Sequence, residues 1–160
     1  MEKRVLKTLT LFTSLVEKGS LMHQFYILMS YDKNKRGLTT ISSLQMSTAS
    51  EEEMHYSFGI DLINIIKKEY PNLWEEYLID LITKNLEVAY DTELRIIDWF
   101  FEKGVPKHLT KEEVINFLNY NFNIICRDLG LDKVFKFDEK LSIEKNEWFN
   151  IKLKITEPDF

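Results

Sequence analysis

Cysteine, glycine and proline are scarce in this sequence. Its 160 residues include one cysteine, five glycines and three prolines. A single thiol, Cys126, cannot form a disulfide within the chain or a cysteine-rich zinc site, so we expect a reducing compartment and a buried side chain. With few helix breakers, and with 44% hydrophobic and 29% charged residues, the composition excludes collagen-like and disordered chains and favours helices.

Long apolar runs and an excess of positive charge are also missing. No stretch of about eighteen apolar residues is present, and the first residues lack the apolar core and cleavage site of a signal peptide. The formal net charge is -5, whereas phosphate binding needs clustered lysine and arginine. We therefore expect a cytoplasmic protein that binds neither membrane nor nucleic acid, long enough for one domain or half of a larger one.

Apolar residues at helical spacing predict an all-α bundle of four helices with an irregular C-terminal tail. The predicted helices span residues 3–30, 38–70, 72–102 and 110–130, and the last thirty residues are expected to be irregular. Pro71 should end the second helix. Asn72 with Glu75, and Thr110 with Glu113, have the spacing of capping boxes at the starts of the third and fourth. Five large side chains there are interpreted as core or subunit-contact residues: Trp74, Trp99, Phe100, Phe101 and Phe117.

One carboxylate lies on an otherwise apolar helical face. Glu17 shares that face with Leu9, Thr13, Leu21 and Phe25, at spacings of three or four residues. An unpaired buried carboxylate costs several kcal/mol, so Glu17 should be protonated, paired or bound to a metal. The alternative is that Glu17 lies at the margin of the apolar stripe and reaches solvent.

A second carboxylate stands beside an imidazole. Glu52 and His55 are three residues apart, which places them on one face of the second helix. Alone, this pair is interpreted as a solvated cluster. Together with an inward Glu17, it is half of the ligand set of carboxylate-bridged dinuclear metal bundles, which use one Glu from each of two helices and Glu-x-x-His from two others.

The other half of that ligand set is absent from the sequence. His23 and His108 have Ser20 and Val105 three residues earlier, so neither repeats Glu-x-x-His. No other helix is expected to carry a second inward Glu. We expect His23 to pack or lie on the helix surface and His108 to lie in a polar turn.

The segment from Ser50 to Asn64 resembles the second metal-ligand helix of class I ribonucleotide reductase small subunits. Four further segments also resemble that family: Val16-Glu17, Lys35–Leu38, Glu69–Trp74 and Lys145–Phe149. The resemblance implies a ferritin-like helical domain over residues 1–149 that is the C-terminal half of such a subunit. It also implies a flexible tail over residues 150–160 that docks on the large subunit through Asp159 and Phe160.

By the same resemblance, Glu17, Glu52 and His55 are metal ligands of a dinuclear iron or manganese–iron site. Glu51 stands where the family has an Asp that contacts a ligand histidine, and it is our candidate catalytic residue. The site would react with dioxygen to generate the radical used to reduce ribonucleotides to deoxyribonucleotides. The missing half is expected on a second polypeptide from a split gene, and the pair is expected to bind the large subunit, to form a homodimer and to be inactive without the N-terminal half.

Two other hypotheses stay open on the sequence. Two copies of the chain could pair antiparallel, each giving one Glu and one Glu-x-x-His, to form a stand-alone oxidase or metal-storage protein. The chain could instead be a metal-free regulatory protein that docks through its tail. The absence of tyrosine after Tyr120 favours this last hypothesis, because the family carries a redox tyrosine in its tail.

Overall fold

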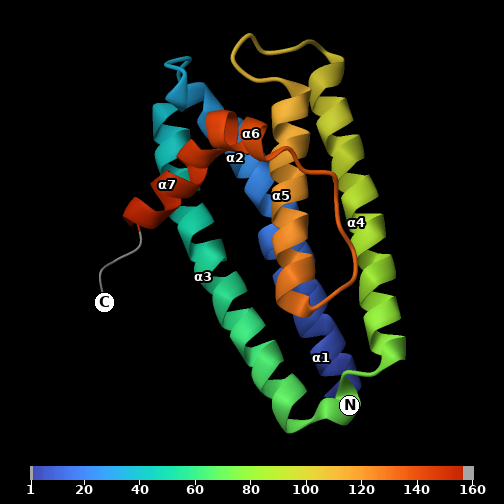
Figure 1. Ribbon diagram of the computed structural model, residues 1–160. Helices are drawn as coiled ribbons and strands as arrows, with labels where there is room; N and C mark the ends of the chain where they lie inside the picture. The colour runs from blue at the N-terminus through green and yellow to red at the C-terminus, as the bar shows by residue number, and fades with distance from the viewer. Residues whose placement is uncertain (1, 157–160) are drawn as a thin grey trace.

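The computed structural model describes residues 2–156 as a bundle of helices, with no strand among these residues (Figure 1). The all-α, ferritin-like fold is therefore confirmed. The elements in chain order are α1 (Glu2–Leu11), η1 (Phe12–Ser20), α2 (Leu21–Lys33), α3 (Thr39–Glu69), η2 (Pro71–Leu73), α4 (Glu76–Glu102), α5 (Lys111–Leu129), α6 (Glu139–Leu141), η3 (Ser142–Asn146) and α7 (Glu147–Thr156). None of the helices in the described range is long and apolar enough to cross a membrane.

The first predicted helix is continuous, but its middle turns are wider than α-helical turns. Helices α1 and α2 follow one another through η1, which is a π-helix over Phe12–Ser20. A π-helix makes i→i+5 hydrogen bonds, so its turns hold more residues than α-helical turns and rotate the side chains that follow. This continuous helix ends at Lys33, three residues beyond the predicted boundary at residue 30. A tight turn follows, in which Lys35 and Leu38 have positive φ.

The remaining helix boundaries test the capping predictions. Helix α3 ends at Glu69, as Pro71 requires. The capping box predicted at Asn72 is wrong: Pro71–Leu73 form a short 3-10 turn, and α4 begins only at Glu76 without a side-chain cap. The box at Thr110 is confirmed, because its hydroxyl accepts from the Glu113 N–H while the Glu113 carboxylate accepts from the Thr110 N–H.

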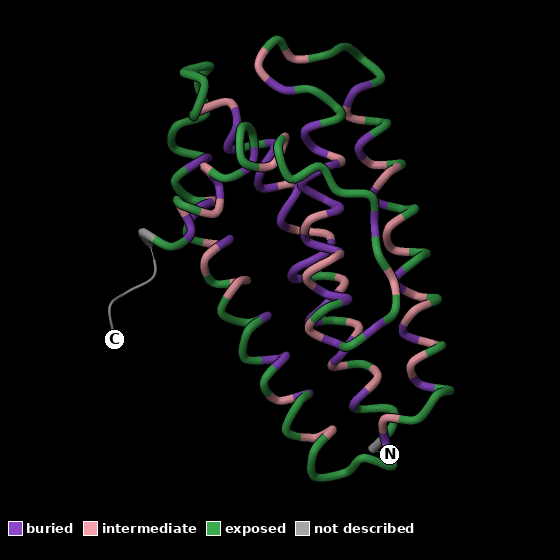
Figure 2. Tube along the Cα trace, in the orientation of Figure 1, coloured by how far each residue is buried: buried purple, intermediate pink, exposed green. Residues whose placement is uncertain are grey.

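The core lies between α2, α5 and the C-terminal helices. Figure 2 shows buried positions concentrated along α2 and α5, on the sides that face the middle of the bundle. Tyr26 of α2 stacks on Phe117 of α5 with ring centroids 4.6 Å apart, and Phe149 of α7 meets both rings edge-on. Aromatic contacts of this kind join three segments that are far apart in the sequence.

The prediction of an irregular C-terminal region is wrong for residues 139–156. Residues 131–138 are indeed extended, and asparagine side chains of α5 bind their backbone: Asn123 pairs with Phe135, and Asn116 accepts from the Asp138 N–H. Asp138 then accepts from the Leu141 N–H and begins a helical stretch that ends in α7, which packs on α3. Phe149 and Leu153, one turn apart, are buried and hold this stretch against the bundle.

Candidate metal centre

The π-helical segment η1 directs the Glu17 carboxylate into the protein. Glu17 is only 7% exposed, so the alternative that it lies at the margin of the apolar stripe is wrong. Its Oε2 atom is buried without a hydrogen-bond partner. Burial raises the pKa of Glu17, the nearby Glu52 carboxylate adds to this, and His55 partly offsets it. An unpartnered buried oxygen is the state in which a carboxylate gains most from a cation.

Helix α3 brings Glu52 and His55 to the same place. Their side chains face each other, with His55 Nδ1 3.5 Å from Glu52 Oε2. One ligand atom from each of Glu17, Glu52 and His55 lies within 4.8 Å of the others. The His55 side chain is 60% exposed and that of Glu52 20%, so the group is buried on the η1 side and open on the other. Two carboxylates and one imidazole form a donor set suited to divalent iron or manganese.

Two contacts hold η1 against α3 at this level. A Cβ atom on Gly59 would overlap the side chain of Thr13, so the helices approach this closely only because Gly59 has no side chain. Lys18, which follows Glu17 and is 5% exposed, donates to both oxygens of Glu53, which follows Glu52, at 2.7 and 2.5 Å. Each residue of this ion pair is thus the immediate neighbour of a candidate ligand.

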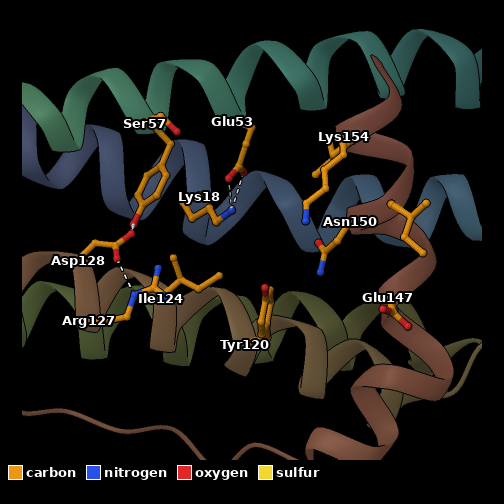
Figure 3. Close-up of a pocket in the computed structure, with 13 residues that line it drawn as sticks. Lys18, Glu53, Ser57, Tyr120, Ile124, Arg127, Asp128, Glu147, Asn150 and Lys154 are labelled. Carbon is orange, nitrogen blue, oxygen red and sulfur yellow. Dashed lines mark hydrogen bonds and ion pairs between the residues drawn. The ribbon is translucent and has the colours of Figure 1, made fainter. Parts of the chain in front are cut away.

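The Lys18–Glu53 pair lines a polar cavity of about 500 Å³ between η1, α3, α5 and α7 (Figure 3). Beside the pair, the buried Tyr56 has its ring 5.3 Å from Lys18 Nζ. Its hydroxyl donates to Asp128 at 2.8 Å, and Asp128 also accepts from Arg127. Burial and the Asp128 carboxylate raise the pKa of Tyr56 far above its usual range. The cations and anions that line the cavity are therefore largely paired with one another.

The structure says less about the other predicted site residues, which are Glu51, Asp159 and Phe160. Glu51 precedes Glu52 on α3 and is exposed. Its role as the residue that orients a ligand histidine stays a prediction. Asp159 and Phe160, predicted to dock on a large subunit, lie outside the described residues.

The expectation that no other helix carries an inward Glu is wrong. Glu93 of α4 is 4% exposed; its Oε1 atom accepts from the Ser20 hydroxyl at 2.5 Å, and its Oε2 lies 3.3 Å from Nε2 of the fully buried His23. Burial raises the pKa of Glu93 and lowers that of His23 to about 4, so it disfavours the charged form of each group. The sequence did offer a signal for a buried Glu93, because its spacing from Leu86 and Ile97 places all three on one face of α4.

Comparison with known proteins identifies the group to which this bundle belongs. The model of the family "Ribonucleotide reductase, small chain" matches residues 1–142. The chain belongs to that family. Its members hold a dinuclear metal site, and the Glu17, Glu52 and His55 group is the candidate for it here.

A curated relative shows how much of a family member the match covers. The chain is 30% identical over 81 residues to the ribonucleoside-diphosphate reductase subunit beta of Chlamydia pneumoniae. This match covers 51% of the chain but only 23% of that protein. The matched part of the chain therefore spans about a quarter of the length of this family relative.

Proposed function

We propose that the chain is the C-terminal half of a ribonucleotide reductase small subunit and that it supplies half the ligands of a dinuclear metal site. The observation that carries this proposal is the group formed by Glu17, Glu52 and His55, which is buried on one side and open on the other. Three ligands fall short of the set that a dinuclear carboxylate site uses. A second polypeptide, the N-terminal half from a split gene, would supply the remainder.

The surface around the group supports a protein partner. His55, Phe58, Leu62 and Ile65 recur at spacings of three and four and therefore share one face of α3. Phe58 is 71% exposed and Ile65 52%. On the neighbouring helix formed by α1 and η1, Val5 and Phe12 are also more than half exposed. Large apolar side chains beside an incomplete ligand group are what we expect where further helices of the bundle pack.

The residues of this chain have distinct parts in the proposed reaction. Glu17, Glu52 and His55 would hold the two ions, while the Lys18–Glu53 pair and the Gly59–Thr13 contact fix the spacing of the helices that present them. When bound, a dinuclear iron or manganese–iron centre supplies the dioxygen chemistry that generates the radical for ribonucleotide reduction. Glu51 would orient a ligand histidine, since outer carboxylates commonly fix imidazole ligands.

The proposed assembly has further partners. The end of the predicted tail over residues 150–160, with Asp159 and Phe160, would dock on a reductase large subunit where ribonucleotides are reduced; residues 150–156 of that tail lie in α7. Two assembled pairs would form a homodimer. The chain would thus be an oxidoreductase subunit that is inactive without its N-terminal half, in the cytoplasm.

The test is the native mass and metal content of the complex purified from the protein's own cells. We expect a second polypeptide with its own Glu-x-x-His and two metal ions per pair. E17Q and E52Q should each lower the bound metal at least about tenfold at limiting metal, because removing a ligand charge weakens the site strongly. The matched control E69Q, at the exposed end of α3, should retain full metal.

Other outcomes would reject this proposal. A homodimer of the chain with two metals would support a stand-alone oxidase or metal-storage protein instead. A partner complex with no metal, unchanged by E17Q, would support a regulatory role.

A further inference from the structure

Both ends of the π-helical segment η1 contact neighbouring helices. Near its start, Thr13 packs so closely against Gly59 of α3 that a Cβ atom on the glycine would overlap it. Its last residue, Ser20, donates a 2.5 Å hydrogen bond to Glu93 Oε1 on α4. Figure 1 shows α3 and α4 at opposite edges of the bundle, with the continuous helix of α1, η1 and α2 between them. The two contacts therefore lie on different sides of η1.

An uninterrupted α-helix could not make both contacts. Thr13 and Ser20 are seven residues apart, and seven residues make about two turns of an α-helix, so the two side chains would share one face. A π-helix holds more residues in each turn, which rotates Ser20 away from the face of Thr13. The Thr13–Gly59 and Ser20–Glu93 contacts are thus compatible with each other because η1 has wider turns.

Glu17 lies between these two contacts along the chain. It follows Thr13 by four residues and precedes Ser20 by three, and its carboxylate joins the Glu52 and His55 group. If Thr13 stays against α3 and the turns narrow to those of an α-helix, Glu17 rotates away from its present direction. Metal ligands must be held within about 0.5 Å of their working positions, so such a rotation would weaken the site.

Glu93 is an unfavourable residue for a purely structural position. It is 4% exposed, its Oε2 atom lacks a hydrogen-bond partner within the described chain, and burial raises its pKa. His23 Nε2 lies 3.3 Å from that atom but forms no hydrogen bond with it. Apolar side chains of similar size often replace buried ionisable groups without loss of stability. Stability alone therefore does not explain this carboxylate, whereas its bond to Ser20 fixes the end of η1.

We infer that Glu93 is a positioning residue for the metal centre: through Ser20 it maintains the wide turns of η1, and these turns direct Glu17 into the site. The inference rests on the proposed function, because it assigns Glu93 a role toward that metal site. It goes beyond that function by adding a residue of α4, a helix that contributes none of the three candidate ligands.

Manganese binding to the full chain, purified with any bound partner, tests the role of Glu93. E93L removes the hydrogen-bond acceptor, and it should raise the dissociation constant for Mn²⁺ at least about tenfold, as loss of an outer residue commonly does. S20A removes the donor and should have a similar effect. E93Q keeps an oxygen that accepts from the Ser20 hydroxyl, so its affinity for Mn²⁺ should stay close to the native value.

The matched control for a loss of stability is L86A. Leu86 is fully buried on the same face of α4, about two turns before Glu93. L86A leaves a cavity and destabilises the protein, but it removes no atom of the Ser20–Glu93 hydrogen bond. Its affinity for Mn²⁺ should therefore stay close to the native value. If L86A and E93L both lower this affinity in proportion to their loss of stability in urea, Glu93 is only structural and the inference is overturned.

A double-mutant cycle tests whether Glu93 acts through Glu17. In the native protein, E17Q removes the charge of a correctly placed ligand, whereas in E93L that ligand is already displaced. E17Q should therefore lower the affinity for Mn²⁺ less in E93L than in the native protein. Additive effects would mean that Glu93 does not act through Glu17, which would overturn the inference.

Crystal structures of the metal-free complexes separate this inference from the proposed function, because they need no bound metal. In E93L, η1 should adopt α-helical turns with Glu17 rotated away from Glu52, whereas E93Q and L86A should keep the π-helical turns. If the native protein binds no Mn²⁺ but E93L loses the π-helical turns, the proposed metal site fails while Glu93 still directs Glu17. If the π-helical turns persist in E93L, the inference fails even where the native protein binds metal.

Discussion

At the residue scale, the most informative buried group outside the metal centre is His23. It is fully buried beside Glu93, and burial lowers its pKa from 6.5 to about 4. The unfolded chain therefore binds a proton at a higher pH than the folded chain does. The stabilising contribution of neutral His23 is complete above pH 6.5 and is lost as the pH falls towards 4.

This predicts acid-sensitive stability that depends on one residue. Between pH 7 and pH 5 the free energy of unfolding should fall by about 2 kcal/mol because of His23. Urea titrations of the purified complex at both pH values measure the difference, and H23Q should abolish it. Glu93 acts in the opposite sense, since its raised pKa favours the folded state at low pH and this contribution is lost as the pH rises. An equal loss in H23Q and in the native protein would mean that another group is responsible.

The residues of the candidate site divide into those that sequence could find and those that it could not. Glu17 stood out because it interrupts an apolar face, and Glu52 with His55 because their spacing is local. Lys18 gave no comparable signal, because it is buried by Glu53, 35 residues further along the chain. Tertiary pairing of this kind leaves no periodic trace. The spacing of Glu93 with Leu86 and Ile97 on α4, by contrast, was a signal that was available but not recognised.

At the element scale, a close helix contact lies where η1 meets α3. Gly59 and Thr13 are both buried, and a methyl group at position 59 would overlap the Thr13 side chain. G59A should therefore push the two helices apart, even though alanine is the better helix former. Overpacking of this kind costs about 1–3 kcal/mol.

Thermal unfolding and metal content together measure this effect. We expect G59A to lower the melting temperature and also the bound metal, because Glu17 on η1 and Glu52 on α3 move apart. T13A should recover part of both losses in the double variant, since it removes the atoms that clash. S57A, an exposed position on the same helix, is the matched control. If the G59A protein is destabilised but binds the normal amount of metal, the Gly59–Thr13 contact does not position the metal ligands.

The helices show which boundaries local chemistry decides. Pro71, the Thr110 capping box and Gly130 with its left-handed φ of 70° mark ends that the sequence predicts correctly. The π-helical turns of η1 were not predictable, because no local residue requires them, and the Asp138 cap is a weak local signal for the helices that follow it. Their conformations depend on contacts with distant elements, including the Asn116 side chain that anchors Asp138 and the α3 surface under α7.

At the scale of the whole molecule, two features of the proposed half-subunit make its folding less favourable unless a metal or a partner chain is bound. Glu17 is buried with an unpartnered oxygen, and large apolar side chains beside His55 face solvent, with Phe58 71% exposed. Both features oppose folding of the isolated chain. A ligand or partner that binds only the folded state adds stability in proportion to the logarithm of its concentration over its dissociation constant.

We therefore predict that the isolated, metal-free chain is unstable or aggregates, and that ferrous or manganous ion with the N-terminal half rescues it. Calorimetry should show the melting temperature rise with metal and again with the partner. E52Q should lose the metal-dependent rise but keep the partner-dependent one, because the apolar face stays intact. E69Q should behave as the native chain does. A cooperative, reversible melt of the isolated metal-free chain would contradict this prediction, because the buried carboxylate and exposed apolar face would then be tolerated without either partner.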